Sequence, residues 1–139
     1  MKLITNLKLM KSIVMLVFVT SFTTLTAQNS TDKAVGILTF ENETIDFGTI
    51  AAKENGIRAF KFTNTGNAPV VISQVKSSCG CTVASKPEKP VLPGETAQIE
   101  VSYDTKKIGT FSKSVTVISN AKEERMVLKI KGEIIKRAL

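Results

Sequence analysis

The stretch LPGETAQIEVSY, residues 92–103, combines a tight turn with the pattern of a half-buried β-strand. Its first four residues fit a type II turn, because proline presets φ at the second position and glycine accepts the left-handed conformation at the third. Ile99, Val101 and Tyr103 then alternate with polar residues. A period of two places one set of side chains in a core and the other in water. The stretch therefore predicts a turn followed by a strand with one buried face.

The same alternation and the same kind of turn recur along most of the chain. Short runs rich in Val, Ile, Phe and Thr follow one another at the spacing of about eight to twelve residues that is typical of a β-sandwich. No segment has the i, i+3, i+4 spacing of an amphipathic helix, so the crossover helices of a parallel sheet are missing. We predict an all-β fold, a single immunoglobulin-like antiparallel sandwich of about seven to eight strands, at 36–40, 44–50, 57–64, 69–76, 81–85, 97–103, 110–119 and 125–135.

Alternation also predicts which side chains fill the sandwich. Lys61, between two phenylalanines, is expected in solvent, while the apolar members of each alternating run face inward. The residues expected inside are Phe60, Phe62, Val71, Ile99, Val101, Tyr103, Val115, Val117, Leu128 and Ile130.

The N-terminus has the features of a secretory signal peptide. Lys2, Lys8 and Lys11 precede the uninterrupted apolar run Ile13–Val19. A more polar stretch, TSFTTLTA, follows and ends in a small residue, as signal peptides do. The run is shorter than the roughly 20 residues of a transmembrane helix. We therefore expect a removable signal rather than a membrane anchor.

Cleavage is expected between Ala27 and Gln28, which assigns residues 1–27 to the signal peptide. Residues 28–34 are polar and are expected to form a flexible lead-in, and residues 35–139 are expected to form one domain. The mature protein would then be exported, to the periplasm or the cell exterior, without a stable membrane anchor. Its formal net charge would fall from +7 to +4, because the signal peptide contains three lysines and no acid.

The basic residues of the expected mature chain do not predict a nucleic-acid site. They are dispersed, and many alternate with apolar residues, as in Lys129-Ile130-Lys131. This arrangement is typical of the wet face of a sheet, whereas a nucleic-acid groove gathers basic residues with stacking aromatics. We therefore expect no nucleic-acid partner.

The composition also argues against most enzyme mechanisms. The chain contains no histidine, which removes the usual general base and the usual partner of a Ser or Cys nucleophile. Glu41, Glu43 and Asp46 could in principle provide paired carboxylates. Charged residues at such strand edges are more often solvated and also discourage aggregation. We expect no catalytic residues.

Cys79 and Cys81, separated only by Gly80, are the two cysteines of the chain. In an extended strand their Cα atoms would be about 6.6 Å apart, near the upper end of the range of about 4.4–6.8 Å that a disulfide permits. A bond in a strand would therefore be strained, although Gly80 could bend the chain by taking a positive φ. A strained, short-loop disulfide suits exchange chemistry better than stabilisation.

Two other interpretations of this cysteine pair remain open. In the first, both thiols are packed as small side chains at the start of a strand, since free cysteine is among the most buried residue types. They could also hold Cu(I), but no histidine is present and Met126 is the one methionine left after signal cleavage. We rank packing and a labile disulfide together, ahead of metal binding, and expect no metal site and no cofactor.

Several motifs together resemble a bacterial family catalogued as domain of unknown function 1573. They are the N-x-G sequence in FKFTNTGNAPVVIS, the Cys-Gly-Cys run, L-P-G-E and the closing K-G-E. The similarity extends from about residue 44 to residue 135. Members of this family are similar to immunoglobulin-like modules of the major-sperm-protein and ASH type. The resemblance implies a β-sandwich in exported proteins and supplies no reaction.

Two hypotheses for function follow. The first is an exported, non-catalytic module for binding, scaffolding or adhesion, whose edge strands pair with a protein or cell-envelope partner. The second is a thiol–disulfide redox protein or Cu(I)-handling protein centred on Cys79 and Cys81. The reactivity of the two thiols in the folded protein separates the hypotheses.

Overall fold

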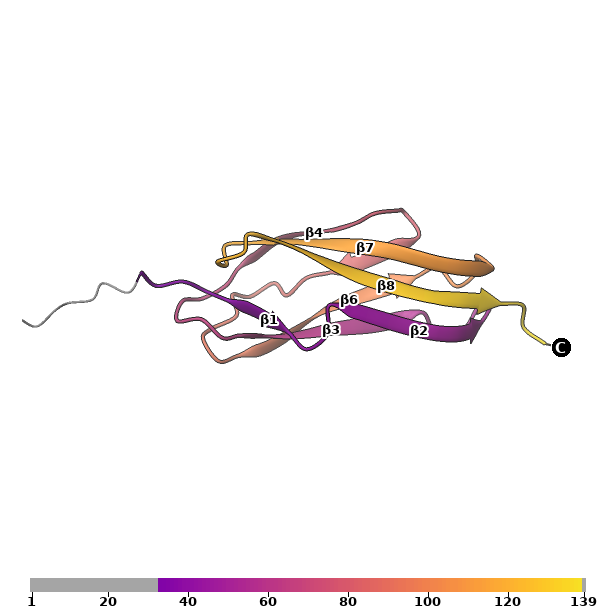
Figure 1. Ribbon diagram of the computed structural model, residues 1–139, viewed down its shortest axis with the longest axis horizontal. Coiled ribbons are helices and arrows are strands. Elements are labelled where there is room, and N and C mark those ends of the chain that lie inside the picture. Colours follow the sequence, from indigo (N-terminus) through magenta and orange to yellow (C-terminus); the bar gives the residue numbers. More distant parts are fainter. Residues whose placement is uncertain (1–32, 139) are drawn as a thin grey trace, which may run out of the picture. The chain divides into compact units, whose positions relative to one another are not determined.

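Eight β-strands provide the regular secondary structure of residues 33–138, the part of the chain that the computed structural model describes. They form two four-stranded sheets (Figure 1). Sheet 1 has the order β1-β3-β6-β5, and sheet 2 has the order β2-β8-β7-β4. The strands are β1 (Leu38–Phe40), β2 (Thr44–Ala51), β3 (Ile57–Asn64), β4 (Ile72–Ser77), β5 (Thr82–Ser85), β6 (Thr96–Tyr103), β7 (Gly109–Ser119) and β8 (Arg125–Ile135).

The predicted immunoglobulin-like sandwich is confirmed, with one difference in strand direction. All strand pairs are antiparallel except β2 and β8, which are parallel. The chain crosses from sheet 1 to sheet 2 between β1 and β2, and β2 then runs beside β8 (Figure 1). A parallel pair needs a long connection. Here the connection is the rest of the sandwich, so no crossover helix is required.

The core lies between the two sheets and is continuous. Sheet 1 contributes Phe60 and Phe62, whose side chains are 1% and 0% exposed, and sheet 2 contributes Leu128 and Ile130, both 0% exposed. Nine of the ten residues expected inside are buried. Lys61, between the two phenylalanines, is exposed as expected. The period-two pattern therefore predicts the inner face correctly in almost every strand.

Val71 is the exception, because its side chain is 44% exposed. Its neighbours Val70 and Ile72 are buried instead. Val70 forms an isolated antiparallel bridge to Val91, and the pairing of β4 with β7 shifts register just after Ile72. The backbone of Val71 faces Asn120, whose Oδ1 accepts a hydrogen bond from Val71 N at 2.7 Å. These long-range contacts determine which side chains of this segment face the core, and the local alternation of the sequence does not reveal them.

The predicted turn before β6 is confirmed by its backbone. Gly94 has φ of +82°, the left-handed conformation that favours glycine at this position of a type II turn. Glu95 N donates to Leu92 O at 3.0 Å and closes the turn, and the Glu95 carboxylate accepts from Leu92 N at 2.9 Å.

The expected signal peptide, its cleavage site at Ala27 and Gln28, and all but the end of the lead-in lie outside the described residues. The first described residues, Lys33 and Ala34, are exposed and belong to no strand. None of the residues that the structure describes forms a helix long and apolar enough to cross a membrane.

Candidate functional site

The Cys-Gly-Cys sequence forms the turn that carries the chain from β4 to β5. These strands are the outermost members of sheet 2 and sheet 1, so the turn connects the two sheets along one side of the sandwich. β5 begins at Thr82, and Cys81 lies in the turn rather than in the strand. The prediction of a strand that starts at Cys81 is therefore wrong by one residue, and this residue changes the geometry of the cysteine pair.

The sulfur atoms of Cys79 and Cys81 form a disulfide in the structure. Their Cα atoms are 5.3 Å apart, well inside the usual range, because a turn brings residues i and i+2 closer than a strand does. The disulfide therefore forms without the strain that an extended strand would impose on it. Both cysteines are half-buried, and the Cys81 side chain packs against the hydrophobic core.

Gly80 does not have the role expected from sequence. Its φ is not among the positive values, which occur at Gly48, Gly94 and Gly109 among the glycines. Apart from its chain neighbours Cys79 and Cys81, no residue has an atom within 4 Å of a Cβ added to Gly80. Gly80 is exposed in the turn and provides no left-handed backbone conformation there.

Hydrogen bonds that do not involve sulfur hold the turn in place. Ser77 Oγ lies 2.8 Å from Cys79 O and 2.6 Å from Thr82 O. Thr82 N donates to Cys79 O at 3.3 Å, and Asp104 N donates to Cys81 O at 2.9 Å.

Strand β7 holds the other end of the turn. Ser78 N donates to Ser114 O at 2.9 Å, and Ser114 N donates to Ser78 Oγ at 3.1 Å. The turn is thus attached to both sheets independently of the S–S bond.

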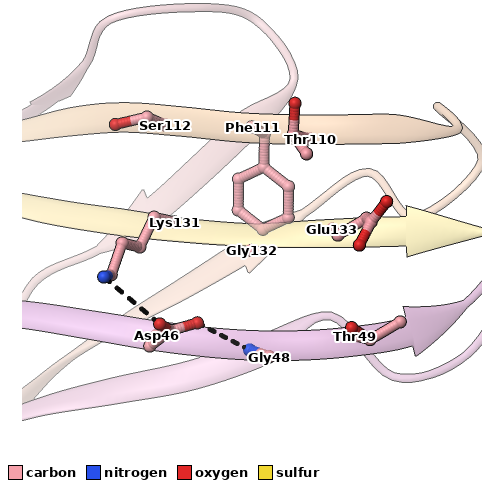
Figure 2. A pocket seen from close by; sticks show the side chains of 9 residues that line it. All are labelled: Asp46, Gly48, Thr49, Thr110, Phe111, Ser112, Lys131, Gly132 and Glu133. Carbon is pink, nitrogen blue, oxygen red and sulfur yellow. Dashed lines mark hydrogen bonds and ion pairs between the residues drawn. The ribbon is translucent and has the colours of Figure 1, made fainter.

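A second candidate is a shallow depression on the solvent face of sheet 2, over β2, β8 and β7 (Figure 2). Its sides carry Thr49, Thr110, Ser112 and Glu133 together with an ion pair between Asp46 and Lys131. Among the residues that the structure describes, no three Cys, Asp or Glu side chains converge in a way that could hold a metal ion. The depression is open to solvent and gathers side chains of mixed charge.

Asp46 has two partners in this depression, and both are drawn in Figure 2. Its carboxylate accepts a hydrogen bond from Gly48 N at 2.8 Å and lies 3.3 Å from Lys131 Nζ. The Gly48 hydrogen bond, followed by the interaction with Lys131, lowers the pKa of Asp46. Asp46 is therefore an ionised carboxylate on the solvent-exposed surface. Glu41 and Glu43 are also exposed.

The third candidate is a gap between β1 of sheet 1 and the first half of β8 in sheet 2, which we call the β1–β8 gap. Its volume is about 210 Å³. Leu38, Phe40 and Met126 provide apolar surface, and Glu43, Lys122 and Glu123 provide charged groups at its margin. The gap exists because β2 joins β8 only from the Thr44–Lys129 pair onward.

Backbone groups on both sides of the β1–β8 gap have no strand partner among residues 33–138. Lys129 N donates to Glu43 O at 2.8 Å, so by strand alternation the amides and carbonyls of Val127 and Arg125 point the same way, beyond the reach of β2. Glu41 N bonds to Lys61 O on β3. By the same alternation, the amides and carbonyls of Leu38 and Phe40 face away from β3.

The neighbouring part of the same side is closed. There the Arg58 guanidinium of β3 covers the ring of Phe47 in β2, at 4.8 Å from its centroid. Arg58 Nη1 also donates to Ile57 O at 2.8 Å. An inward-pointing charge of this kind blocks the addition of another strand. The β1–β8 gap is therefore the more accessible half of this edge.

Sequence reasoning identified the cysteine pair but not the residues that position it. Ser77, Ser114 and Asp104 come from three segments of the chain, and no local pattern links them. The β1–β8 gap was also missed, because it depends on where β2 begins to pair with a strand about 85 residues later, which only the register shows.

The sequence matches a family model, described as a protein of unknown function (DUF1573), over residues 38–134. The chain belongs to the DUF1573 family. The match covers all eight strands, from β1 to the penultimate residue of β8. The resemblance found in the sequence is thereby confirmed. No curated protein matches the sequence of this DUF1573 chain.

Solved structures similar to this DUF1573 domain share its fold at low sequence identity. A protein of unknown function from Porphyromonas gingivalis W83 has a TM-score of 0.63 and 17% identity, with 70% of this chain and 46% of that chain covered. This chain thus matches less than half of the Porphyromonas protein. The ASH / PapD-like domain 7 of human CEP192 has a TM-score of 0.60 and 12% identity, covering 73% and 87%.

The fold also occurs as part of an enzyme. The VesB protease of Vibrio cholerae has a TM-score of 0.58 and 13% identity, with 69% of this chain and 31% of that chain covered. At such identities the likeness shows an immunoglobulin-like, PapD-like sandwich and nothing about activity.

Proposed function

We propose that this protein is an exported, non-catalytic binding module that receives an extended segment of a partner protein in the β1–β8 gap. The observation that carries the proposal is the backbone edge of β8 at Arg125 and Val127, which has no strand partner and flanks Met126 in the lining of the β1–β8 gap. A strand with unpaired N–H and C=O groups can be extended by a peptide, which gains main-chain hydrogen bonds. The expected partner is therefore a polypeptide in β conformation.

The gap also defines the side chains that such a segment should have. A strand beside Arg125–Leu128 would be about four residues long, at roughly 3.3 Å per residue. Its inward side chains would contact Leu38, Phe40 and Met126, which line the gap, and should be apolar. Its other side chains would lie in solvent and should be polar. Sequence specificity then comes from two inward positions, as in other β-strand additions.

Selection from a display library of eight-residue peptides with alternating apolar and polar residues tests this binding mode. Synthetic copies of the selected peptides are then titrated against the full mature protein. We expect binding to slow amide hydrogen exchange at Val127 and Arg125, and also at Leu38 or Phe40. A library that gives no binder, or binders that protect amides elsewhere, would contradict the proposal.

Two substitutions at one position separate backbone pairing from side-chain contact. Val127→Pro removes an amide that bonds to no other strand in the described structure, and proline is tolerated where the amide faces an open edge. It should abolish peptide binding while leaving the fold intact. Val127→Thr keeps the amide and the β-branched shape, so it should bind as the unchanged protein does. If Val127→Pro also bound normally, strand addition at β8 would be wrong.

Export is a separate part of the proposal, supported by the basic lead, the short apolar run and the small residue at position 27. Protein recovered from the cell envelope or the culture medium should begin at Gln28 on N-terminal sequencing. Protein that retains Met1 and stays in the cytoplasm would contradict it.

A further inference from the structure

We propose that the Cys79–Cys81 disulfide is a thiol–disulfide exchange site, whose substrate is a dithiol of another protein, and that it opens and closes without unfolding the sandwich. This inference is independent of the binding module proposed above. The turn joins β4 and β5, which form one edge of sheet 2 and of sheet 1. The β1–β8 gap lies at the other edge, at the β1 end of sheet 1 and the β2–β8 end of sheet 2.

The first argument is that the disulfide contributes little to holding the turn. A bond between residues two apart closes the smallest of loops, so its effect on the entropy of the unfolded chain is near the lower limit for disulfides. Meanwhile Ser77, Ser78 and Asp104 hold the turn through hydrogen bonds to the chain on both sides. After reduction these hydrogen bonds remain, so both thiols stay close enough to form the bond again.

The second argument is that the bond is accessible to another protein. The turn joins the edge strands β4 and β5, Gly80 between the two cysteines is exposed, and both cysteines are themselves partly exposed. Neither cysteine belongs to the fully buried core. Stabilising disulfides of small domains usually staple segments that are far apart in sequence, which this bond does not do.

The third argument is the difference between the two sulfurs. Cys81 packs against the core, whereas Cys79 is not among the residues packed there. Cys79 Sγ lies 3.8 Å from Thr82 Oγ1, within hydrogen-bond reach for sulfur. A hydroxyl at this place can donate to a Cys79 thiolate and favour its charged form. Cys79 is therefore assigned as the sulfur that bonds to the substrate, and Cys81 as the sulfur that leaves when this bond forms.

The proposed exchange is balanced in atoms and electrons. A thiolate of the substrate attacks Cys79 Sγ, the S–S bond breaks, and Cys81 leaves as a thiolate that takes up a proton from solvent. The second substrate thiolate then attacks the substrate sulfur of the mixed disulfide and releases Cys79 as a thiolate, which is also protonated. The substrate dithiol loses two electrons and becomes a disulfide, and the cysteine pair gains two electrons and two protons.

Reduction of the full mature protein gives the first test. We expect equilibration in millimolar glutathione buffers to give a measurable reduced fraction that changes with the ratio of reduced to oxidised glutathione. Amide chemical shifts should change near residues 77–82, 104 and 114, with the rest of the spectrum retained. The melting temperature should fall by less than about 10 °C, in keeping with so short a loop. A bond that stays fully oxidised in every buffer, or a reduced form that loses its dispersed spectrum, would overturn the proposal.

Single-cysteine variants test the two assigned roles. With an excess of oxidised glutathione as probe, Cys81→Ser should accumulate a mixed disulfide between Cys79 and glutathione. Cys79→Ser should react at least about tenfold more slowly through Cys81, because its thiol is packed and lacks the Thr82 hydroxyl. Thr82→Val in the Cys81→Ser background should slow alkylation of Cys79 at neutral pH without loss of fold. Equal reaction of the two single-cysteine variants would overturn the assignment.

A matched control removes the two sulfurs together. Cys79→Ser with Cys81→Ser should keep the native spectrum, because the hydrogen bonds of the turn persist, and should lose all exchange with glutathione. If this variant failed to fold, the disulfide would be a structural staple and the proposal would be wrong.

Discussion

At the scale of single residues, Asn64 connects two of the sequence motifs that identify the family. Its side chain is completely buried and uses all of its hydrogen-bonding capacity. Oδ1 accepts from Ile37 N and Gly66 N, and Nδ2 donates to Ala68 O and Val91 O at 2.8 and 2.9 Å. The backbone carbonyl of Asn64 accepts from Gly94 N at 2.7 Å. The N-x-G motif and the L-P-G-E turn are therefore in direct contact.

Replacement of Asn64 by alanine should be strongly destabilising. It removes the side-chain partner of Ile37 N, Gly66 N and Ala68 O at once, whereas Val91 O keeps the hydrogen bond from Val70 N. A buried polar group left without a partner costs about 1–3 kcal/mol. We expect a loss of about 3 kcal/mol or more in the free energy of unfolding, measured by chemical denaturation. Asn67→Ala is the matched control, because Asn67 makes an exposed hydrogen bond to Val35 N. A similar loss in both variants would show that the buried network is not the cause.

Tyr103 should make the stability of the domain fall at alkaline pH. Burial of its phenol, followed by the nearby charge of Asp104, raises the pKa of Tyr103 above its ordinary value. The unfolded chain loses the phenol proton from about pH 10 upward while the folded chain retains it. This contribution is therefore complete below pH 10 and is lost as the pH rises.

Tyr103→Phe tests that expectation. The phenylalanine ring can keep the stacking on Phe111, whose ring centroid lies 3.8 Å away, but it cannot ionise. Denaturation curves at pH 8 and above pH 10 should show a smaller decrease in stability for Tyr103→Phe than for the unchanged protein. Equal decreases in the two proteins would contradict the prediction.

At the scale of elements, the strands differ in how completely local alternation determines which of their side chains face the core. β3 and β6 lie within sheet 1 and pair over seven residue pairs without a register shift, so alternation assigns them correctly. β4 lies at an edge and carries a register shift, and there the prediction for Val71 is wrong. A bulge adds one residue and exchanges the inner and outer faces.

A pair of substitutions, one in β6 and one in β3, compares the stability cost of changing an inward side chain with that of changing an outward one. Val101→Asp places an unpaired charge where exposure is 0%, and should cost more than about 4 kcal/mol, leaving much of the protein unfolded. Lys61→Ala changes an exposed side chain and should stay within about 0.5 kcal/mol. Circular dichroism during denaturation compares the two. Similar behaviour of both variants would mean that these strands face the opposite way.

At the scale of the whole molecule, residues 33–138 have one core to which both sheets contribute. The chain changes sheets at every connection except β5–β6 and β7–β8. Neither sheet can keep its inner face buried without the other. A domain built in this way is expected to unfold as one cooperative unit.

Two probes of denaturation test this cooperativity. Tyr103 in sheet 1 is the only tyrosine of a chain without tryptophan, so its fluorescence reports the surroundings of one residue, while far-ultraviolet circular dichroism reports all strands. The two transitions should have the same midpoint and the same slope. Separate midpoints would indicate that one part of the sandwich unfolds before the other.

The sequence by itself determined the fold class, the approximate strand bounds and most of the core, because alternation and turn chemistry are local properties. It also located the cysteine pair. Only the tertiary structure decided that β2 pairs parallel to β8, that Val70 rather than Val71 is buried, and that Cys81 lies in a turn. The β1–β8 gap and the hydrogen bonds around the cysteines likewise follow from the pairing of segments far apart in the chain. All of these features depend on the register between paired strands, and the sequence of one segment alone does not determine that register.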